Sequence, residues 1–125
     1  MPFRNAELFP LDARINTAGN LEIGGCDTVS MAQEFGTPLY VYDESTIRRM
    51  ARTYLQEFSS RYPDTTVAYA SKAFLNKEMS RIAYEEGLSL DVVSGGEIAV
   101  ALSTGFPAKR MYFHGNNKSH QELSD

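Results

Sequence analysis

Residues 66–113 decide the fold of this chain, and they read TVAYASKAFLNKEMSRIAYEEGLSLDVVSGGEIAVALSTGFPAKRMYF. Short runs rich in strand-forming residues predict three strands, at 66–71, 88–93 and 110–113. Two helical patterns separate these strands, at 76–87 and from about 97 to 104. Strands that alternate with helices over short connections form a mainly parallel sheet with crossover helices. The stretch therefore predicts an α/β fold.

The same rhythm continues on both sides of this stretch. Before it, Pro38–Tyr42 is an apolar run that predicts a strand, and a helical pattern follows from Asp43 to about Tyr62. After it, a polar loop leads to Ser119, which predicts the cap of another helix with Glu122 completing a capping box. The complete order is strand then helix, four times over. Four strands of a doubly wound sheet form a small domain, which is one alternative. Four such units are half of a closed eight-stranded barrel, which takes about 250 residues, so a barrel fold makes this chain a fragment.

The first 36 residues are less regular. Leu8-Phe9 and Leu21–Ile23 indicate short strands, with Gly24-Gly25 ending the second. Asp27 or Thr28 predicts the cap of a helix that runs through Phe35 and closes at Gly36. We therefore expect an N-terminal arm over residues 1–36 and the α/β part over residues 37–125.

Composition narrows the class of protein. Of the 125 residues, 42% are hydrophobic and 22% are charged, and the formal net charge is −4. A mildly acidic chain gives no electrostatic reason to expect binding to nucleic acid or to an anionic membrane. No apolar stretch is long enough for a transmembrane helix, and the N-terminus carries charges where a signal peptide would be apolar. One cysteine and two histidines predict neither a disulfide nor a metal site, and we expect a cytoplasmic protein.

Lys72 is the first candidate for chemistry. Strand alternation predicts Ala68, Ala70 and Lys72 on one face, with the amine at the carboxyl end of the strand. That end of a parallel strand is where α/β folds hold their active sites. Small neighbours leave room for a flat ring, and a lysine amine can attack a carbonyl to form a Schiff base. The alternative is a solvated lysine where a strand meets water.

Two further segments follow the next strand ends. Asp91–Glu97 forms a strand end, a tight turn and a helix start, which can offer backbone N–H groups to an anion. The alternative is an ordinary turn in which Glu97 favours the helix N-terminus. Phe113–Ser119 is polar, and its His114 is either an acid–base or ligand-enclosing group or a histidine held by loop hydrogen bonds. Asp91 is expected to point toward Lys72.

Four stretches, taken together, resemble the diaminopimelate decarboxylases. They are GTPLYVYDESTIRR, VAYASKAF, EEGLSLDVVSGGEIAVAL and GFPAKRMYFHGNNKS, and they cover the chain from about residue 36 to its end. DVVSGGE followed by FHGNNKS is specific to that enzyme, whereas the small-residue strand ending in lysine is shared with ornithine and arginine decarboxylases and alanine racemase. Residues 1–35 match less sharply.

The resemblance implies a fold, a cofactor and residue roles. It implies an alanine-racemase-like (β/α)8 TIM barrel that binds pyridoxal 5′-phosphate, with the N-terminal segment joining a separate β domain. By motif, Lys72 becomes the Schiff-base lysine, and Ala70, Asp91 and His114 become cofactor-site residues. Glu97 and Asn116 match the motifs with roles left open.

The implied reaction removes carbon dioxide from meso-2,6-diaminopimelate and yields L-lysine, in a homodimer. The family's phosphate-binding glycines, its substrate-binding arginines and its partner-subunit contacts match nothing in these residues, so we expect no useful turnover from this chain alone. Two alternatives remain: a sister enzyme of the superfamily acting on another amino acid, and a non-catalytic α/β binding module.

Overall fold

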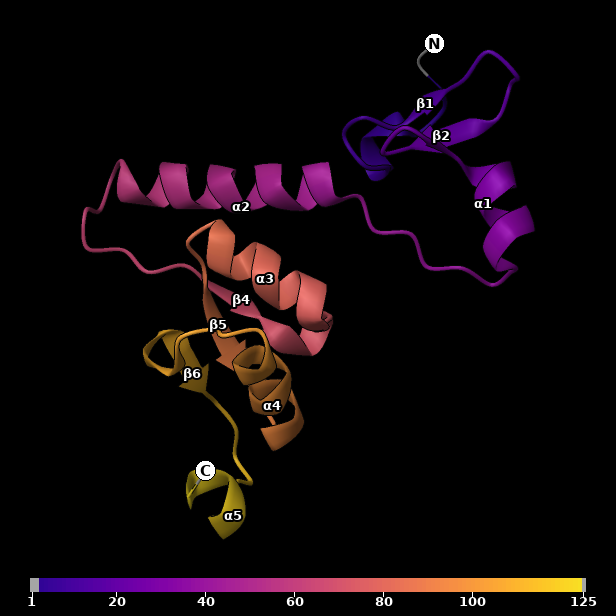
Figure 1. Ribbon diagram of the computed structural model, residues 1–125. Helices are drawn as coiled ribbons and strands as arrows, with labels where there is room; N and C mark the ends of the chain where they lie inside the picture. Colours follow the sequence, from indigo (N-terminus) through magenta and orange to yellow (C-terminus); the bar gives the residue numbers. More distant parts are fainter. Residues whose placement is uncertain (1–2, 125) are drawn as a thin grey trace. The chain divides into compact units, whose positions relative to one another are not determined.

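The computed structural model of the protein describes residues 3–124, and Figure 1 traces them from the N-terminal to the C-terminal end. The chain divides into two compact units, Met1–Met50 and Ala51–Asp125, so the division lies within a helix, α2 (Glu44–Ser59). The expected division after residue 36 stays a prediction. The two units are described separately below.

The first unit contains a small antiparallel sheet. Its order is β1 (Arg14–Ile15), β2 (Leu21–Ile23) and β3 (Cys26–Asp27), and the Gly24-Gly25 turn separates β2 from β3. The strand expected at Leu21–Ile23 is therefore confirmed. The prediction of a strand at Leu8-Phe9 is wrong, because a 3-10 helix, η1, covers Ala6–Leu8. The amides of Leu8 and Phe9 bond to carbonyls three residues back, at 3.0 and 3.1 Å, instead of to a neighbouring strand.

Helix α1 (Thr28–Phe35) follows β3, and both of its expected ends are confirmed. The Asp27 carboxylate accepts hydrogen bonds from the amides of Val29 and Ser30 at 2.9 and 3.0 Å, which satisfies donors that have no partner within the helix. Gly36 closes the helix with a φ of 80°, a conformation that glycine adopts without steric cost.

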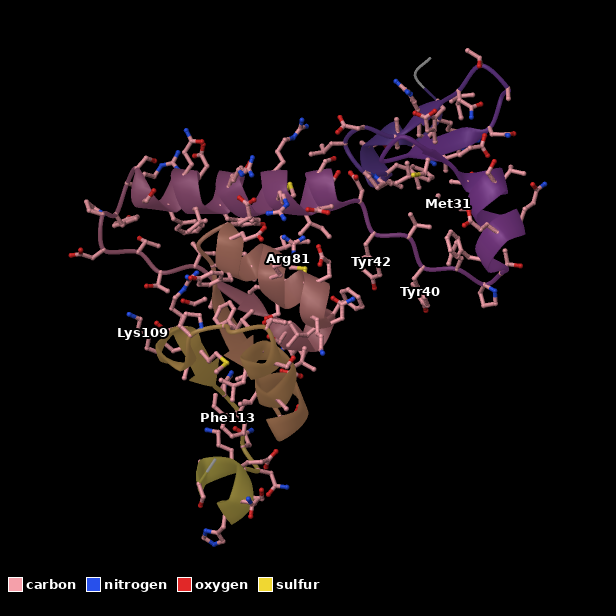
Figure 2. All side chains as sticks on the ribbon, viewed as in Figure 1. Met31, Tyr40, Tyr42, Arg81, Lys109 and Phe113 are labelled. Atoms are coloured by element: carbon pink, nitrogen blue, oxygen red, sulfur yellow. The ribbon has the colours of Figure 1, made fainter. Side chains whose placement is uncertain are left out.

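The segment before α2 corrects a prediction. Pro38–Tyr42 was expected as a strand, but it forms no ladder with any strand of residues 3–124. Its side chains are exposed, including Tyr40 at 87% and Tyr42 at 52%, and Figure 2 shows both tyrosines projecting from the ribbon between α1 and α2. Strand propensity mostly measures packing against neighbours, so a run of strand formers without a paired neighbour stays irregular. Asp43 then caps α2, accepting from the Thr46 amide at 3.1 Å.

The second unit is the α/β part. In chain order after α2 it contains β4 (Ala68–Ala70), the 3-10 helix η2 (Ser71–Ala73), α3 (Lys77–Glu85), β5 (Ser89–Val92), α4 (Gly95–Ser103), the 3-10 helix η3 (Ala108–Arg110), β6 (Met111–Phe113) and α5 (His120–Ser124). The strands are shorter than expected, but every expected helix and strand of this unit is present. The sheet has the order β4-β5-β6 and is parallel throughout, which confirms the predicted alternation (Figure 1).

One face of this sheet builds the core. Leu90 and Val92 of β5 are fully buried, and they cluster with Ala83 of α3, Ala101 of α4 and Ala51 of α2. Residues of the same face on the outer strands pack against this cluster; they are Val67, Tyr69, Met111 and Phe113. Helices therefore cover one face of the sheet, and the opposite face is open within the described residues.

Among residues 3–124, no helix combines the length and the apolar character needed to cross a bilayer.

Candidate functional site at the carboxyl edge of the parallel sheet

The open face of the sheet brings together residues that the sequence singled out. Ala70 of β4 lies opposite Asp91 of β5 in the parallel ladder, and Asp91 lies opposite Tyr112 of β6. Partners in a ladder project to the same side of a sheet, so these side chains share the face that the helices leave uncovered. Ala68, two residues before Ala70, also belongs to this face and is exposed. The face thus combines two methyl groups, a carboxylate and a phenol.

Lys72 lies just past the carboxyl end of β4. The strand ends at Ala70, and the chain turns into the 3-10 helix Ser71–Ala73. Strand alternation therefore stops two residues short of the lysine, which corrects the argument that placed Lys72 on the face of Ala68 and Ala70. The lysine side chain is exposed, and within residues 3–124 its ammonium makes no hydrogen bond or ion pair, with Asp91 or any other group.

The turn that carries Lys72 is held from both sides. The Tyr69 hydroxyl donates to the Phe74 carbonyl at 2.8 Å, bridging the 3-10 helix. Ser71 is 2% exposed, so the residue before the lysine is buried. Its hydroxyl has no hydrogen-bond partner among the described residues. The buried Ser71 therefore anchors the turn, and the exposed Lys72 that follows it keeps its amine accessible.

His114 follows β6 and lies beside Asp91. Its Nδ1 atom is 3.8 Å from Oδ1 of the aspartate. The His114 amide donates to the Val92 carbonyl at 2.9 Å, which extends the parallel ladder one residue beyond β6. The histidine side chain is 76% exposed and the aspartate side chain 26%. The structure therefore brings together three of the four predicted site residues, Ala70, Asp91 and His114, and it records no contact between them and Lys72.

The turn after β5 offers fewer free donors than its sequence suggested. The Val93 amide donates to the Glu97 carboxylate at 2.8 Å, and the Glu97 amide donates to the Ser94 hydroxyl at 3.3 Å. The Gly95 amide donates to the Glu122 carboxylate at 3.1 Å. These three amides are satisfied by side chains of the chain itself. The alternative of an ordinary capped turn is therefore the better description, and Glu97 has a structural role in it.

A pyridoxal cofactor fits the residues at this edge. A flat ring needs space over the sheet, and alanine at positions 68 and 70 supplies the smallest side chains that still form a strand. An aldehyde needs an accessible amine, which Lys72 offers at the end of the same strand. A phosphate group would need free donors elsewhere, because the three amides of the turn after β5 are occupied.

A hollow lies within the first unit, apart from the edge described above. It has a volume of about 800 Å³, and Arg14, Glu22, Asp43 and Arg48 are among the residues that line it. Its charges are paired internally: Arg14 with Glu22, and Arg48 with Glu44 at 2.7 Å. The Asp43 carboxylate caps α2. Since structural contacts occupy these groups, we favour the carboxyl edge of the parallel sheet as the functional site. No group of three or more potential metal ligands occurs among residues 3–124.

Comparison with known proteins identifies the family. Residues 44–125, which include the whole parallel sheet and Lys72, match the family described as pyridoxal-dependent decarboxylase, pyridoxal binding domain. The chain belongs to the pyridoxal-dependent decarboxylases. The family name confirms the expectation of pyridoxal phosphate as the cofactor. It does not assign roles to individual residues, so those of Lys72, Ala70, Asp91 and His114 stay predictions.

Individual relatives agree on a narrower group. The chain is 56% identical over 111 residues to a diaminopimelate decarboxylase of Bacillus subtilis, covering 89% of this chain and 25% of that protein. It is 47% identical over 116 residues to one of Methanothermobacter thermautotrophicus, covering 93% and 27%. These similarities confirm the resemblance found in the motifs.

A solved structure confirms the fold class. The diaminopimelate decarboxylase from M. jannaschii in co-complex with L-lysine matches with a TM-score of 0.77 and 31% identity, over 91% of this chain and 27% of that chain. The observed units are thus part of an alanine-racemase-like barrel with its N-terminal segment. The chain spans about a quarter of the length of the relatives that it matches.

Two contacts at this edge were not foreseen. Tyr112 shares the open face with Asp91, which the ladder register shows and which strand alternation alone predicts only when the register is known. Glu122 was recognised as half of a capping box, but its second contact, with the Gly95 amide, joins segments 27 residues apart. No local sequence pattern predicts a contact between residues that lie so far apart in the sequence.

Proposed function

We propose that this chain supplies the lysine-bearing edge of the pyridoxal-phosphate site of a diaminopimelate decarboxylase. In this proposal the enzyme acts on meso-2,6-diaminopimelate and produces L-lysine and carbon dioxide. The observation that carries the proposal is an accessible amine, Lys72, immediately after a strand whose open face is formed by Ala68 and Ala70. Support also comes from the names of the relatives, at 56% and 47% identity.

Each site residue has a proposed task. The Lys72 Nζ atom would hold the cofactor covalently through its aldehyde carbon. Ala70 would leave room for the ring, and Asp91 would set the charge beside it. His114, paired with Asp91 at 3.8 Å, would limit access of water from the β6 side. The cofactor, when bound, supplies the electron sink that accepts the bonding pair left by carbon dioxide.

Partners and location are also proposals. We propose a homodimer in the cytoplasm, with an amino acid as the small-molecule substrate and without nucleic acid or membrane as a partner. A formal net charge of −4 supports the exclusion of nucleic acid and anionic membranes as partners, and a single cysteine supports the location. A related possibility is another amino-acid substrate, because the matched family description names a cofactor and no substrate.

The test uses the full-length protein with added pyridoxal phosphate. We expect a visible absorbance band of the lysine-bound cofactor and release of carbon dioxide from meso-2,6-diaminopimelate. Lys72→Ala should abolish both, since no other group would hold the aldehyde covalently at this edge. Lys109→Ala is the matched control, because Lys109 is also an exposed lysine but lies in the 3-10 helix η3, before β6 (Figure 2). An unchanged band in Lys72→Ala would refute the assignment, and preference for ornithine, arginine or another amino acid would change the substrate.

A further inference from the structure

Glu122 of α5 contacts two separate segments at the carboxyl edge of the sheet. Its Oε2 atom accepts hydrogen bonds from the Ser119 amide at 3.0 Å and from the Ser119 hydroxyl at 2.8 Å. Its Oε1 atom accepts from the Gly95 amide at 3.1 Å. The Glu122 amide in turn donates to the Ser119 hydroxyl at 3.2 Å, which completes a capping box. One oxygen therefore serves the helix that carries the glutamate, and the other serves a different helix, α4.

Glu122 approaches Gly95 closely enough that a side chain at position 95 would touch it. A Cβ atom built at Gly95 would lie 3.4 Å from Cγ and 3.7 Å from Oε1 of Glu122. Gly96, one residue later in the same helix turn, faces only the Ser94 hydroxyl, at 3.8 Å. Neither glycine has a left-handed φ, so alanine is compatible with the backbone at both positions. The close approach of Glu122 is therefore specific to position 95.

The contact joins the two loops that carry the proposed site residues. The loop after β5 begins within two residues of Asp91 and leads to Gly95. The loop after β6 begins at His114 and leads to Ser119. The backbone of His114 is held by its hydrogen bond to the Val92 carbonyl, but the side chains of Asp91 and His114 are linked by a 3.8 Å contact between partly or largely exposed groups, which is too weak to fix the loops beyond it.

We infer that Glu122 is a positioning residue of this site: its carboxylate fixes the β6–α5 loop to the N-terminus of α4 and so keeps His114 against Asp91. The catalytic effect of this positioning rests on the proposed function, whereas the hydrogen bond between Glu122 and Gly95 is independent of it. A carboxylate suits the task because all three groups that approach it are donors. The amides of Ser119 and Gly95, in that order, and the Ser119 hydroxyl lower the pKa of Glu122, so the carboxylate is ionised at neutral pH.

The first test measures amide hydrogen exchange and catalysis in the full-length protein. Glu122→Gln keeps the size of the side chain but turns one acceptor into a donor that faces other donors. We expect the Gly95 and Ser119 amides to exchange roughly tenfold faster, since a hydrogen bond to a charged group is stronger than one to a neutral group. The Leu90 amide in the sheet should be unaffected. The kcat should fall roughly tenfold or more through misplacement of His114, and KM should change much less.

Matched variants separate positioning from folding. Glu122→Ala removes the carboxylate altogether and should reproduce the kcat loss, whereas Gly95→Ala, whose methyl group would make an ordinary van der Waals contact with Glu122, and Gly96→Ala should both behave like wild type. Ser119→Ala removes one donor to the carboxylate and the acceptor of the Glu122 amide, keeps the Gly95 contact, and should accelerate exchange at residue 122 more than at residue 95. These variants keep the inference testable if Glu122→Gln fails to fold.

The possible results distinguish the inference from the proposed function. Unchanged exchange at Gly95 in Glu122→Gln overturns the contact, and an unchanged kcat overturns the positioning role. An unchanged kcat in Glu122→Ala also overturns it. If the wild-type protein loaded with pyridoxal phosphate fails to decarboxylate meso-2,6-diaminopimelate, the proposed function fails, and faster Gly95 exchange would still support the contact.

Discussion

The Nδ1 atom of His114 lies 3.8 Å from the Oδ1 atom of Asp91, across the carboxyl ends of neighbouring parallel strands. With the histidine side chain 76% exposed, water screens this pair strongly. Exposed pairs of this kind contribute about 0–1 kcal/mol to stability. The pair is therefore a poor candidate for a structural element, and its position on the open face of the sheet favours a role in the site.

The first prediction concerns Asp91→Asn. We expect its free energy of unfolding to change by less than about 1 kcal/mol, because the lost pair is exposed. The kcat should fall roughly tenfold or more, because the charge beside the cofactor is removed. Denaturant unfolding and steady-state kinetics on the full-length protein measure the two effects. Asp64→Asn, in the exposed turn before β4, is the control. A large loss of stability with unchanged kcat in Asp91→Asn would make the aspartate structural.

Two buried serines predict opposite effects of the same substitution. Ser71 is 2% exposed and its hydroxyl has no partner among residues 3–124, whereas the Ser80 hydroxyl is 2.8 Å from the Thr104 hydroxyl. An unsatisfied buried hydroxyl costs about 1–3 kcal/mol. Ser71→Ala should therefore be neutral or stabilising.

Ser80→Ala, by contrast, should destabilise by about 0.5–1.5 kcal/mol, since it removes one hydrogen bond, while the Thr104 hydroxyl still donates to the Ala101 carbonyl at 2.7 Å. Comparing the denaturant midpoints of both variants with wild type decides the matter. Equal destabilisation by the two substitutions would show that the Ser71 hydroxyl has a hydrogen-bond partner in solution.

Much of the fold was predictable because its signals are local. The caps at Asp27 and Ser119 were predicted from single residues, and each accepts the expected amide hydrogen bonds. The parallel sheet was predictable because strands and helices alternate over short connections. The strand predicted at Pro38–Tyr42 is wrong because a strand needs a neighbouring strand to pair with, and the composition of a segment does not show whether it has one.

Strand alternation could place the site residues that lie within the strands, but not those that follow the strand ends. Alternation predicts the two faces of each strand, and the ladder register then places Ala70 and Asp91 opposite each other on one face. At Ser71 the chain leaves the strand for a 3-10 helix, so alternation could not carry the argument on to Lys72. The bridge from Glu122 to Gly95 joins segments 27 residues apart, and such contacts depend on how the loops pack.

The open face predicts that residue 70 must be small. Ala70→Leu adds three carbons over the space proposed for the cofactor ring, so we expect the Kd for pyridoxal phosphate to rise roughly tenfold or more. The fold should survive, because this face lies opposite the core cluster. Absorbance titration with the cofactor measures the change. Ala99→Leu, at an exposed position of α4, makes the same substitution away from the site. Equal affinities for the two variants would place the ring elsewhere.

Asp27 predicts a pH dependence in the N-terminal unit. Hydrogen bonds from the Asn20 side chain, the Ser30 amide and the Asn16 side chain lower its pKa from 3.8 to about 2. A lowered pKa in the folded state means that the ionised carboxylate favours folding. The contribution is complete above pH 3.8 and is lost as the pH falls through about 2. Exchange of the Val29 and Ser30 amides, both capped by Asp27, should therefore become faster over this range than intrinsic exchange rates explain.

The variant Asp27→Asn isolates this effect. Asparagine can still accept the Val29 and Ser30 hydrogen bonds, so α1 should still form near neutral pH. Its amide nitrogen, however, would face the side-chain donors of Asn16 and Asn20, which lie 2.6 and 2.9 Å from the Asp27 carboxylate. The variant should be less protected than wild type at pH 6 and should lose no further protection between pH 4 and 2 through this residue. A carboxyl resonance of Asp27 that titrates near pH 4 in the wild-type protein would contradict this account, because it would mean that these hydrogen bonds do not favour the charged form.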